Sequence, residues 1–418
     1  MTQLVVLDPG LRETGGHHPA FILALLGTEL FKANDTRLRV FTNTGFAPGA
    51  VFENGTNNVE YTPFFESDFY RYFYESTQHP ELPNFIRLLT KEYLTAMKQV
   101  IEADCQPRAV KGDASIFLCH ALGWEHATAL ADALFLFKKQ TGITLRIVVM
   151  LMFSPYRKTV NEQYDSQVYL RYRIAFKGLA ACDGVSFFAC DHETSKAYGN
   201  ILARQIDVMP CPFVGGSKKI NSRANKVKQI VLYIGDSKAT KGFLALPNLL
   251  EQIVKPEQKE GLSYIMQYTL TNKSEAFLAV DKKLKTLAEL HPNVSVIDTF
   301  WSEEQLYTTL AAADALVFNY DSNVYMYQSS GVLWLAAYFN VNMLFLSNNW
   351  LTREAARLKC EYTLCEAKKL AFCLNKLRQK AIDNKAYYAN ICSLSGADYH
   401  AKLFGDFTEW LSCILSHN

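Results

Sequence analysis

The sequence lacks several patterns that would assign it to a class at once. None of its ten cysteines forms a CxxC pair, which speaks against a zinc ribbon or a thioredoxin-like redox motif. No run reaches the ~18 apolar residues that a membrane-spanning helix needs. Asp8 and Pro9 directly follow the first apolar run, unlike a secretory signal. We therefore expect reduced thiols and a cytoplasmic protein without a transmembrane segment.

A large charge of one sign is absent as well. The 43 Lys and Arg residues nearly balance the 41 Asp and Glu residues, for a formal net charge of +2. Proteins that bind nucleic acid through its phosphates usually carry an excess of basic residues, so we expect no nucleic-acid partner. Hydrophobic residues make up 49% of the 418, as in globular proteins, and this length predicts two domains.

Short apolar runs alternate with longer segments of helical period, which is the pattern of parallel sheets covered by helices on both faces. The strands predicted in the first half are Leu4–Leu7, Leu38–Thr42, Ser115–Leu118, Leu145–Leu151, Gly184–Phe188 and Ile206–Met209. The helices predicted there are Pro19–Phe31, Asn84–Glu102, Glu125–Lys139 and Val168–Ala181. This alternation predicts one doubly wound α/β domain over residues 1–212.

A polar, basic stretch up to Lys228 separates this region from a second alternation. Its predicted strands are Gln229–Ile234, Ser263–Gln267, Val294–Ile297, Ala315–Asn319 and Asn342–Leu346. Its predicted helices are Phe243–Ile253, Glu275–Leu290, Glu303–Ala313 and Gly331–Phe339. We therefore predict a second Rossmann-like domain over residues 213–395 and an amphipathic terminal helix over residues 396–418.

The loop after the first strand of the second domain combines glycine with lysine. Ligands of open α/β sheets bind beyond the carboxyl ends of the strands, which is where Gly235, Lys238 and Lys241 lie. Backbone N–H groups and two ammonium groups suit a pyrophosphate. A solvated loop with ordinary lysines is the alternative.

A second polar loop follows the predicted strand Ala315–Asn319 and ends in Ser329, Ser330 and Gly331. Either serine can cap the next helix and leave the first amides of that helix directed at an anion. In the alternative, the serines only cap the helix and the nearby tyrosines pack. We favour an anion site, because so polar a loop follows a strand.

In the first half, a loop of glycines and histidines follows the first strand, with Gly15, Gly16, His17 and His18 in sequence. Paired glycines let a ligand approach the backbone closely, and the histidines can donate hydrogen bonds or transfer protons. Two adjacent histidines make a poor metal site, so we expect no metal. A turn that only starts a helix is the alternative.

One further histidine, His120, comes directly after an apolar strand. Its position predicts that it projects into the same crevice as the glycine loop. A lone histidine is more often a structural residue, and that alternative stays open.

Seven aromatic residues gather in a short stretch, Phe64, Phe65, Phe69, Tyr70, Tyr72, Phe73 and Tyr74. Such a stretch can dock an acceptor or face a membrane. Dense aromatic residues more often form core or interdomain packing, which we expect here.

The loops of the second domain resemble those of the GT-B glycosyltransferases, most closely the retaining group of that family. That group has a glycine–arginine pair followed by lysine–glycine after a strand, and Gly235, Lys241 and Gly242 match this spacing. Asp236 stands where the group has its arginine. The group's pair of glutamates is also missing, since Tyr327 occupies one of those positions and a leucine the other.

The resemblance implies two Rossmann-like domains that face a cleft, with the terminal helix packing back on the N-terminal domain. It implies transfer of a sugar from a nucleotide diphosphate to an acceptor hydroxyl of a glycan or lipid-linked glycan, without a metal or another cofactor. Lys241 then receives the charge of the leaving phosphate, and His120 contacts the sugar or the acceptor. A lipid-linked acceptor implies peripheral contact with the inner face of the membrane.

Two other functions stay open. A nucleotide-sugar epimerase shares the architecture but needs carboxylates in the cleft. A catalytically degenerate relative would bind a sugar or a partner protein, and the missing arginine and glutamates favour it. Nucleotide binding separates this relative from both enzymes, and turnover with an acceptor separates the transferase from the epimerase.

Overall fold

The structure of the chain is a computed structural model that describes residues 2–13, 16–32, 36–49, 58–67, 82–104, 115–156, 166–209, 229–254, 261–383 and 396–416. The chain divides into two compact units. Unit 1 consists of Met1–Arg157, Gln163–Gly216 and Ala401–Asn418, and unit 2 consists of Lys158–Glu162 and Ser217–His400.

Unit 1 is built on a seven-stranded parallel sheet in the order β3-β2-β1-β4-β5-β6-β7. Its strands are β1 (Thr2–Leu7), β2 (Thr36–Asn43), β3 (Val59–Phe65), β4 (Ser115–His120), β5 (Arg146–Leu151), β6 (Val185–Ala189) and β7 (Asp207–Val208). The order reverses between β1 and β4, and in such a doubly wound sheet the carboxyl ends of these two strands form the usual ligand position.

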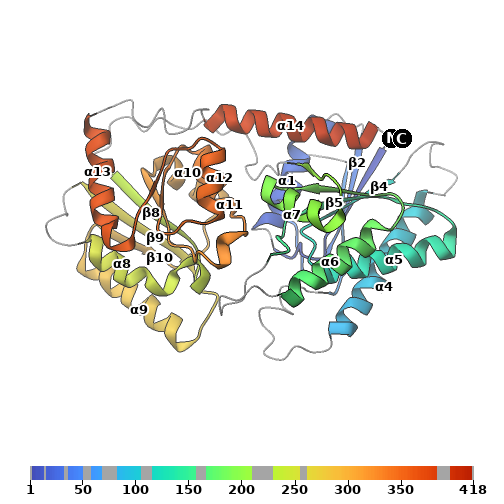
Figure 1. Cartoon of the computed structure of the whole chain (residues 1–418), viewed down its shortest axis with the longest axis horizontal. Helices are drawn as coiled ribbons and strands as arrows, with labels where there is room; N and C mark the ends of the chain where they lie inside the picture. Colours follow the sequence, from blue (N-terminus) through green and yellow to red (C-terminus); the bar gives the residue numbers. More distant parts are fainter. Residues whose placement is uncertain are drawn as a thin grey trace. The chain divides into compact units, whose positions relative to one another are not determined.

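Helices cover both faces of this sheet (Figure 1). They are α1 (His17–Gly27), α2 (Glu29–Lys32), α4 (Leu82–Asp104), α5 (Trp124–Thr141), α6 (Ser166–Ala180) and α7 (His192–Leu202). Because successive side chains of a strand point to opposite faces, β1 contributes to two cores. Val5 and Leu7 pack in the core that includes α4, α5 and α6, whereas Leu4 and Val6 pack in the core with α1.

The terminal helix α14 (Gly396–Ser416) packs on unit 1, as predicted. Phe407 and Leu411 are buried in the same core as Leu4 and Phe21, and the rings of Phe407 and Phe21 lie 6.1 Å apart. Figure 1 shows α14 in red beside α1. The apolar stripe of α14 therefore completes one face of the first sheet.

Unit 2 holds a six-stranded parallel sheet in the order β10-β9-β8-β11-β12-β13. Its strands are β8 (Gln229–Asp236), β9 (Leu262–Thr269), β10 (Val294–Ile297), β11 (Ala315–Phe318), β12 (Asn342–Phe345) and β13 (Tyr362–Leu364). Its helices are α8 (Leu246–Ile253), α9 (Glu275–Leu290), α10 (Glu303–Ala312), α11 (Gly331–Tyr338), α12 (Trp350–Arg357) and α13 (Leu370–Asp383). Both predicted α/β sheets are thus confirmed.

Two edge strands and two helices were not predicted from the sequence. The strand β3 contains Pro63, which is tolerated because β3 is at the edge of its sheet. The strand β13 has only three residues, and the helices α7 and α12 begin at polar caps, Asp191 and Asn349, after short loops. The helix α1 begins at His17 rather than Pro19, so both predicted histidines lie in its first turn.

Of the predicted aromatic cluster, Phe64 and Phe65 belong to β3, where Phe65 is buried and Phe64 packs against the same core. The remaining five members lie outside the described residues, as do Gly15 and the predicted linker through Lys228. Among the residues that the structure describes, no helix is both long enough and apolar enough to cross a membrane.

Candidate functional site

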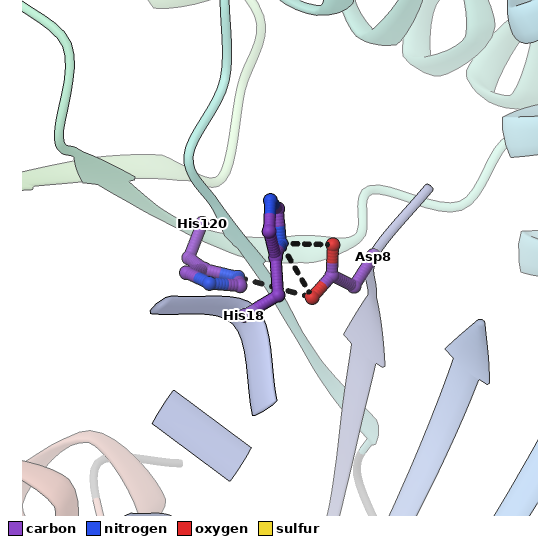
Figure 2. A group of neighbouring side chains, drawn as sticks. All are labelled: Asp8, His18 and His120. Carbon is purple, nitrogen blue, oxygen red and sulfur yellow. Dashed lines mark hydrogen bonds and ion pairs between the residues drawn. The ribbon is translucent and has the colours of Figure 1, made fainter. Parts of the chain in front are cut away.

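The predicted histidines of unit 1 gather around an aspartate at the switch point of the sheet. Nδ1 of His18 lies 2.8 Å from Oδ1 and 3.0 Å from Oδ2 of Asp8. Nδ1 of His120 lies 3.5 Å from Oδ2 of the same carboxylate. Figure 2 shows both imidazoles directed at Asp8. The ring of His17 lies 4.3 Å from that of His18 and 6.4 Å from that of His120.

The sheet itself brings Asp8 and His120 together. The strands β1 and β4 pair in parallel with Val6 opposite Leu118, so residues two positions further along each strand meet at the same edge. His18 reaches this edge from the first turn of α1. All three side chains are buried, with at most 7% of each residue exposed.

Gly10 makes room for the ring of His18. A Cβ at this position would lie 2.2 Å from Cε1 and 2.5 Å from Nε2 of His18, far inside van der Waals contact. The amide of Gly10 also donates a 3.0 Å hydrogen bond to Asp8 Oδ1. The turn after β1 therefore fixes both members of the His18–Asp8 pair.

The electrostatics of this cluster favour a charged aspartate and a neutral His120. Burial raises the pKa of Asp8, but the neighbouring His18 and His120 outweigh it and lower that pKa to about 2. Burial lowers the pKa of His120 to about 4, although the charge of Asp8 acts in the opposite direction. His120 therefore stays neutral near pH 7 and offers one nitrogen donor and one acceptor.

Neither ring nitrogen of His120 has a hydrogen-bond partner among the described residues. Its ring instead stacks on Phe21 at a centroid distance of 4.5 Å. Buried nitrogen atoms without partners are uncommon, and each calls for an explanation such as a ligand or a bound water.

Asp8, His18 and His120 each offer one ligand atom, and these atoms all lie within 4.8 Å of one another. The expectation of no metal assumed that the adjacent histidines have no further ligand nearby, and the fold supplies Asp8 and His120. The 2.8 Å separation between His18 and Asp8 is nevertheless the length of a charge-assisted hydrogen bond. A direct Asp–His contact accounts for this geometry without an ion.

In unit 2, the loop after β8 places a lysine across a glycine. The side chain of Lys241 passes over Gly235, where an added Cβ would lie 3.1 Å from its Cδ and 3.3 Å from its Nζ. Gly235 has a φ of 156°, and Gly242, which follows Lys241, has a φ of 75°. A Cβ on Gly242 would lie 2.0 Å from the carbonyl oxygen of Asn319. Glycine is thus needed at both positions.

Two hydrogen bonds join this loop to the loop after β11. The Asn319 side chain donates a 3.1 Å hydrogen bond to the carbonyl of Gly242, and the amide of Asp321 donates a 2.9 Å bond to the carbonyl of Thr240. The two loops that the sequence singled out in the second half are therefore neighbours in the fold.

Asp236, which replaces the arginine of the retaining group, contacts both lysines of the first loop. Its Oδ2 lies 3.0 Å from Nζ of Lys238 and 3.9 Å from Nζ of Lys241. Burial raises the pKa of Asp236, but Lys241 and then Lys238 outweigh it and hold that pKa below its ordinary value. The loop after β8 thus carries two ammonium groups and one carboxylate.

Ser330 occupies the cap position of α11, and Gly331 is the first residue of that helix. The Ser330 hydroxyl makes no capping hydrogen bond. The alternative in which this serine only caps the helix therefore does not account for its side chain. Ser329, Ser330 and Gly331 are all half-buried. The amino end of an α-helix carries partial positive charge, which favours a nearby anion.

The structure thus sorts the predicted residues into two groups. His17, His18 and His120 meet in unit 1, with Gly16 at the start of α1. The second group is the pair of joined loops in unit 2, which holds Gly235, Lys238, Lys241, Ser329, Ser330 and Gly331. Asp8 was missed as a site residue, although an aspartate directly after an apolar strand and before Pro9-Gly10 was a readable signal.

No family model and no curated protein matches the chain. Solved structures do match it over essentially the whole length of both chains. One is the E. coli structure described as trehalose-6-phosphate bound with UDP-2-fluoro glucose, with 12% identity, 100% of both chains covered and a TM-score of 0.66. Another is an alpha,alpha-trehalose-phosphate synthase (UDP-forming) from Burkholderia xenovorans in complex with glucose-6-phosphate, with 10% identity, 99% and 100% covered and a TM-score of 0.63.

A third similar structure is Anabaena HepE in complex with UDP and glucose, with 14% identity, 100% of both chains covered and a TM-score of 0.59. Identities this low speak for the fold alone. These similar structures, together with the two doubly wound sheets and the terminal helix that packs on the first of them, show that this chain has the GT-B fold.

Proposed function

We propose that the protein is a glycosyltransferase that moves a sugar from a nucleotide diphosphate to an acceptor hydroxyl. The observation that carries this proposal is the position of Lys241, whose ammonium group lies over Gly235 at the carboxyl end of β8. A diphosphate in this crevice would meet an ammonium group and the backbone of a glycine that leaves room for it.

UDP is the first nucleotide to test, because the similar E. coli and Anabaena structures contain UDP-2-fluoro glucose and UDP. In the proposed reaction, negative charge builds on the departing diphosphate while the bond to the sugar breaks. Lys241 stabilises that charge, since a fixed ammonium group needs no rearrangement as the charge develops. Lys238 and the amino end of α11 at Ser330 and Gly331 support it.

The Asp8–His18–His120 cluster serves the sugar side of the reaction. Asp8 fixes the orientation of His18 through Nδ1, and neutral His120 contributes an unsatisfied nitrogen that a sugar hydroxyl can bind. The similar Burkholderia xenovorans and Anabaena structures contain glucose-6-phosphate and glucose. A sugar or sugar phosphate is therefore the first acceptor to assay, and glycans and lipid-linked glycans follow.

The proposed reaction needs no metal and no cofactor besides the nucleotide sugar. The charge of the leaving group is balanced by lysines rather than by a divalent ion, and the electrostatic stabilisation is supplied by Lys241. An epimerase would share the nucleotide site and is separated from the transferase by turnover with an acceptor, whereas a non-catalytic relative is separated from both by nucleotide binding.

The test is thermal unfolding with UDP, GDP and ADP. A nucleotide at ~100 times its dissociation constant should stabilise the folded protein by ~2.7 kcal/mol. We expect a shift with one nucleotide, its loss in Lys241→Ala, and its retention in Lys283→Ala, a control on the exposed face of α9 whose partner is Glu251. No shift with any nucleotide would contradict the proposed function.

A further inference from the structure

A buried tyrosine beside the proposed phosphate site has a hydroxyl that nothing in the described protein satisfies. Tyr320 is the second residue after β11 and is only 3% exposed. Its hydroxyl is buried and has no hydrogen-bond partner among the described residues. Proteins rarely bury such a group without a partner, and an exception calls for an explanation.

A second tyrosine, which contacts the loop after β8, provides the contrast. Tyr233, on β8, is equally buried, but its hydroxyl donates a 3.1 Å hydrogen bond to the carbonyl of Lys241. Burial and then the neighbouring Tyr320 raise the pKa of Tyr233. The hydroxyl of Tyr233 thus has a backbone acceptor, whereas that of Tyr320 has no partner among the described residues.

The side chain of Tyr320 is held in place from several sides. Its ring contacts that of Tyr325 at 4.5 Å and that of Phe318 at 5.5 Å. Its carbonyl accepts a 2.7 Å hydrogen bond from Ser347. The next residue, Asp321, is joined through its amide to the loop after β8. These contacts fix the Tyr320 side chain in its buried position.

The neighbourhood favours an anionic ligand for this hydroxyl. Nζ of Lys241 lies 6.0 Å from the centroid of the Tyr320 ring, so an anion that reaches the ammonium group also comes close to Tyr320. Phosphate oxygens accept hydrogen bonds, and a phenol can donate one. The retaining group places an arginine donor in this loop, whereas Asp236 here has only acceptor atoms when it is ionised.

We propose that the Tyr320 hydroxyl donates a hydrogen bond to the diphosphate of the nucleotide sugar and supplies a donor that the replaced arginine would have given. This inference rests on the proposed function and adds a specific phosphate ligand to it. Because the hydroxyl is buried, binding of the diphosphate includes a local opening of the crevice around Lys241.

The experiment compares Tyr320→Phe with wild type by calorimetric titration with UDP and with uridine. We expect Tyr320→Phe to weaken UDP binding about tenfold, the usual size for one hydrogen bond to a charged group. Uridine binding should be unchanged, because uridine has no phosphate. An equal loss for uridine, or no loss for UDP, would overturn the inference.

Thermal unfolding of the free proteins provides the control, with Tyr233→Phe as the matched variant. Removing an unsatisfied hydroxyl should leave the Tm of Tyr320→Phe unchanged or higher, whereas Tyr233→Phe loses a formed hydrogen bond and should have a lower Tm. A drop for Tyr320→Phe as large as that for Tyr233→Phe would assign the hydroxyl to a bound water and overturn the inference. Failure of wild type to bind any of UDP, GDP and ADP would overturn the proposed function, and this inference with it.

Discussion

Nδ1 of His18 lies 2.8 Å from a carboxylate oxygen of Asp8, and a glycine lies directly beneath the imidazole ring. The turn after β1 is therefore shaped around one pair of side chains.

Gly10→Ala should displace the imidazole of His18. The new Cβ would lie 2.2 Å from Cε1 of that ring, and overpacking of this kind typically costs ~1–3 kcal/mol. We expect a lower Tm and a loss of sugar transfer, with UDP binding retained. Gly178→Ala on α6 is the matched control, since an added Cβ there meets nothing within 4 Å. Equal transfer by both variants would show that His18 has no part in the reaction.

The stability of the folded protein should fall as the pH drops from 6.5 towards 4. The pKa of His120 falls from an ordinary 6.5 to about 4 in the folded state, mainly through burial. The unfolded chain therefore binds the proton first, and stability that is complete above pH 6.5 is lost on acidification, by about 3 kcal/mol. His120→Phe, which can keep the ring contact with Phe21, should remove most of this loss. Chemical denaturation at pH 7 and pH 4.5 measures it, and identical losses in both proteins would refute the prediction.

Asp8 should affect the free energy of unfolding at lower pH than His120 does. Its pKa falls from 3.8 to about 2, because the charges of His18 and His120 outweigh the effect of burial. The stabilisation it gives is therefore present above pH 3.8 and is lost as the pH falls towards 2, by about 2 kcal/mol. In Asp8→Asn this part of the pH dependence should be absent. A pH titration of the free energy of unfolding that has the same slope below pH 4 in both proteins would speak against the pair.

Asp236→Asn should tighten UDP binding. The carboxylate lies 3.0 Å and 3.9 Å from the ammonium groups of Lys238 and Lys241, where it partly cancels the charge that would attract a diphosphate. Removing one charge at ~4 Å in an aqueous setting changes the free energy by ~1 kcal/mol, so we expect an affinity about fivefold higher at low salt. Titration at several salt concentrations checks this, since the gain should shrink as salt rises. Weaker binding would mean that Asp236 acts mainly by positioning the lysines.

Chelation should leave activity unchanged. The Asp8–His18–His120 group offers three ligand atoms, yet its short Asp–His distance is explained by a hydrogen bond. Transfer rates and Tm should be the same before and after dialysis against EDTA. A drop in either quantity that added Zn²⁺ restores would instead identify a metal site in this cluster.

The sequence predicted most central strands, because buried parallel strands appear as apolar runs such as Leu145–Leu151. It did not predict β3 or β13, since edge strands are short or interrupted by residues such as Pro63 and carry little pattern. It indicated the first of the two loops of unit 2 because glycine and lysine at the end of a strand suit an anion, and the second because a polar loop with serines follows a strand. Their connection through Asn319 and Gly242 depends on contacts across the sheet, which no local pattern reveals.

For a similar reason, the sequence predicted the histidines of the candidate site in unit 1 but not their contact with Asp8. The histidines stood out as residue types, but the meeting of residue 8 with residue 120 depends on the register of β1 against β4. Tyr320 was visible as a loop residue, whereas its unsatisfied hydroxyl depends on the tertiary packing around it.

The part of helix α14 that belongs to unit 1 starts at Ala401, after all of unit 2, and it buries Phe407 and Leu411 in the core of unit 1. During translation, the face of the first sheet that carries α1 and Phe21 therefore stays partly uncovered until the second sheet has been synthesised. A nascent chain of this protein should be a client of chaperones that bind exposed apolar surface, and premature termination just before α14 should produce a protein that aggregates rather than a smaller working enzyme.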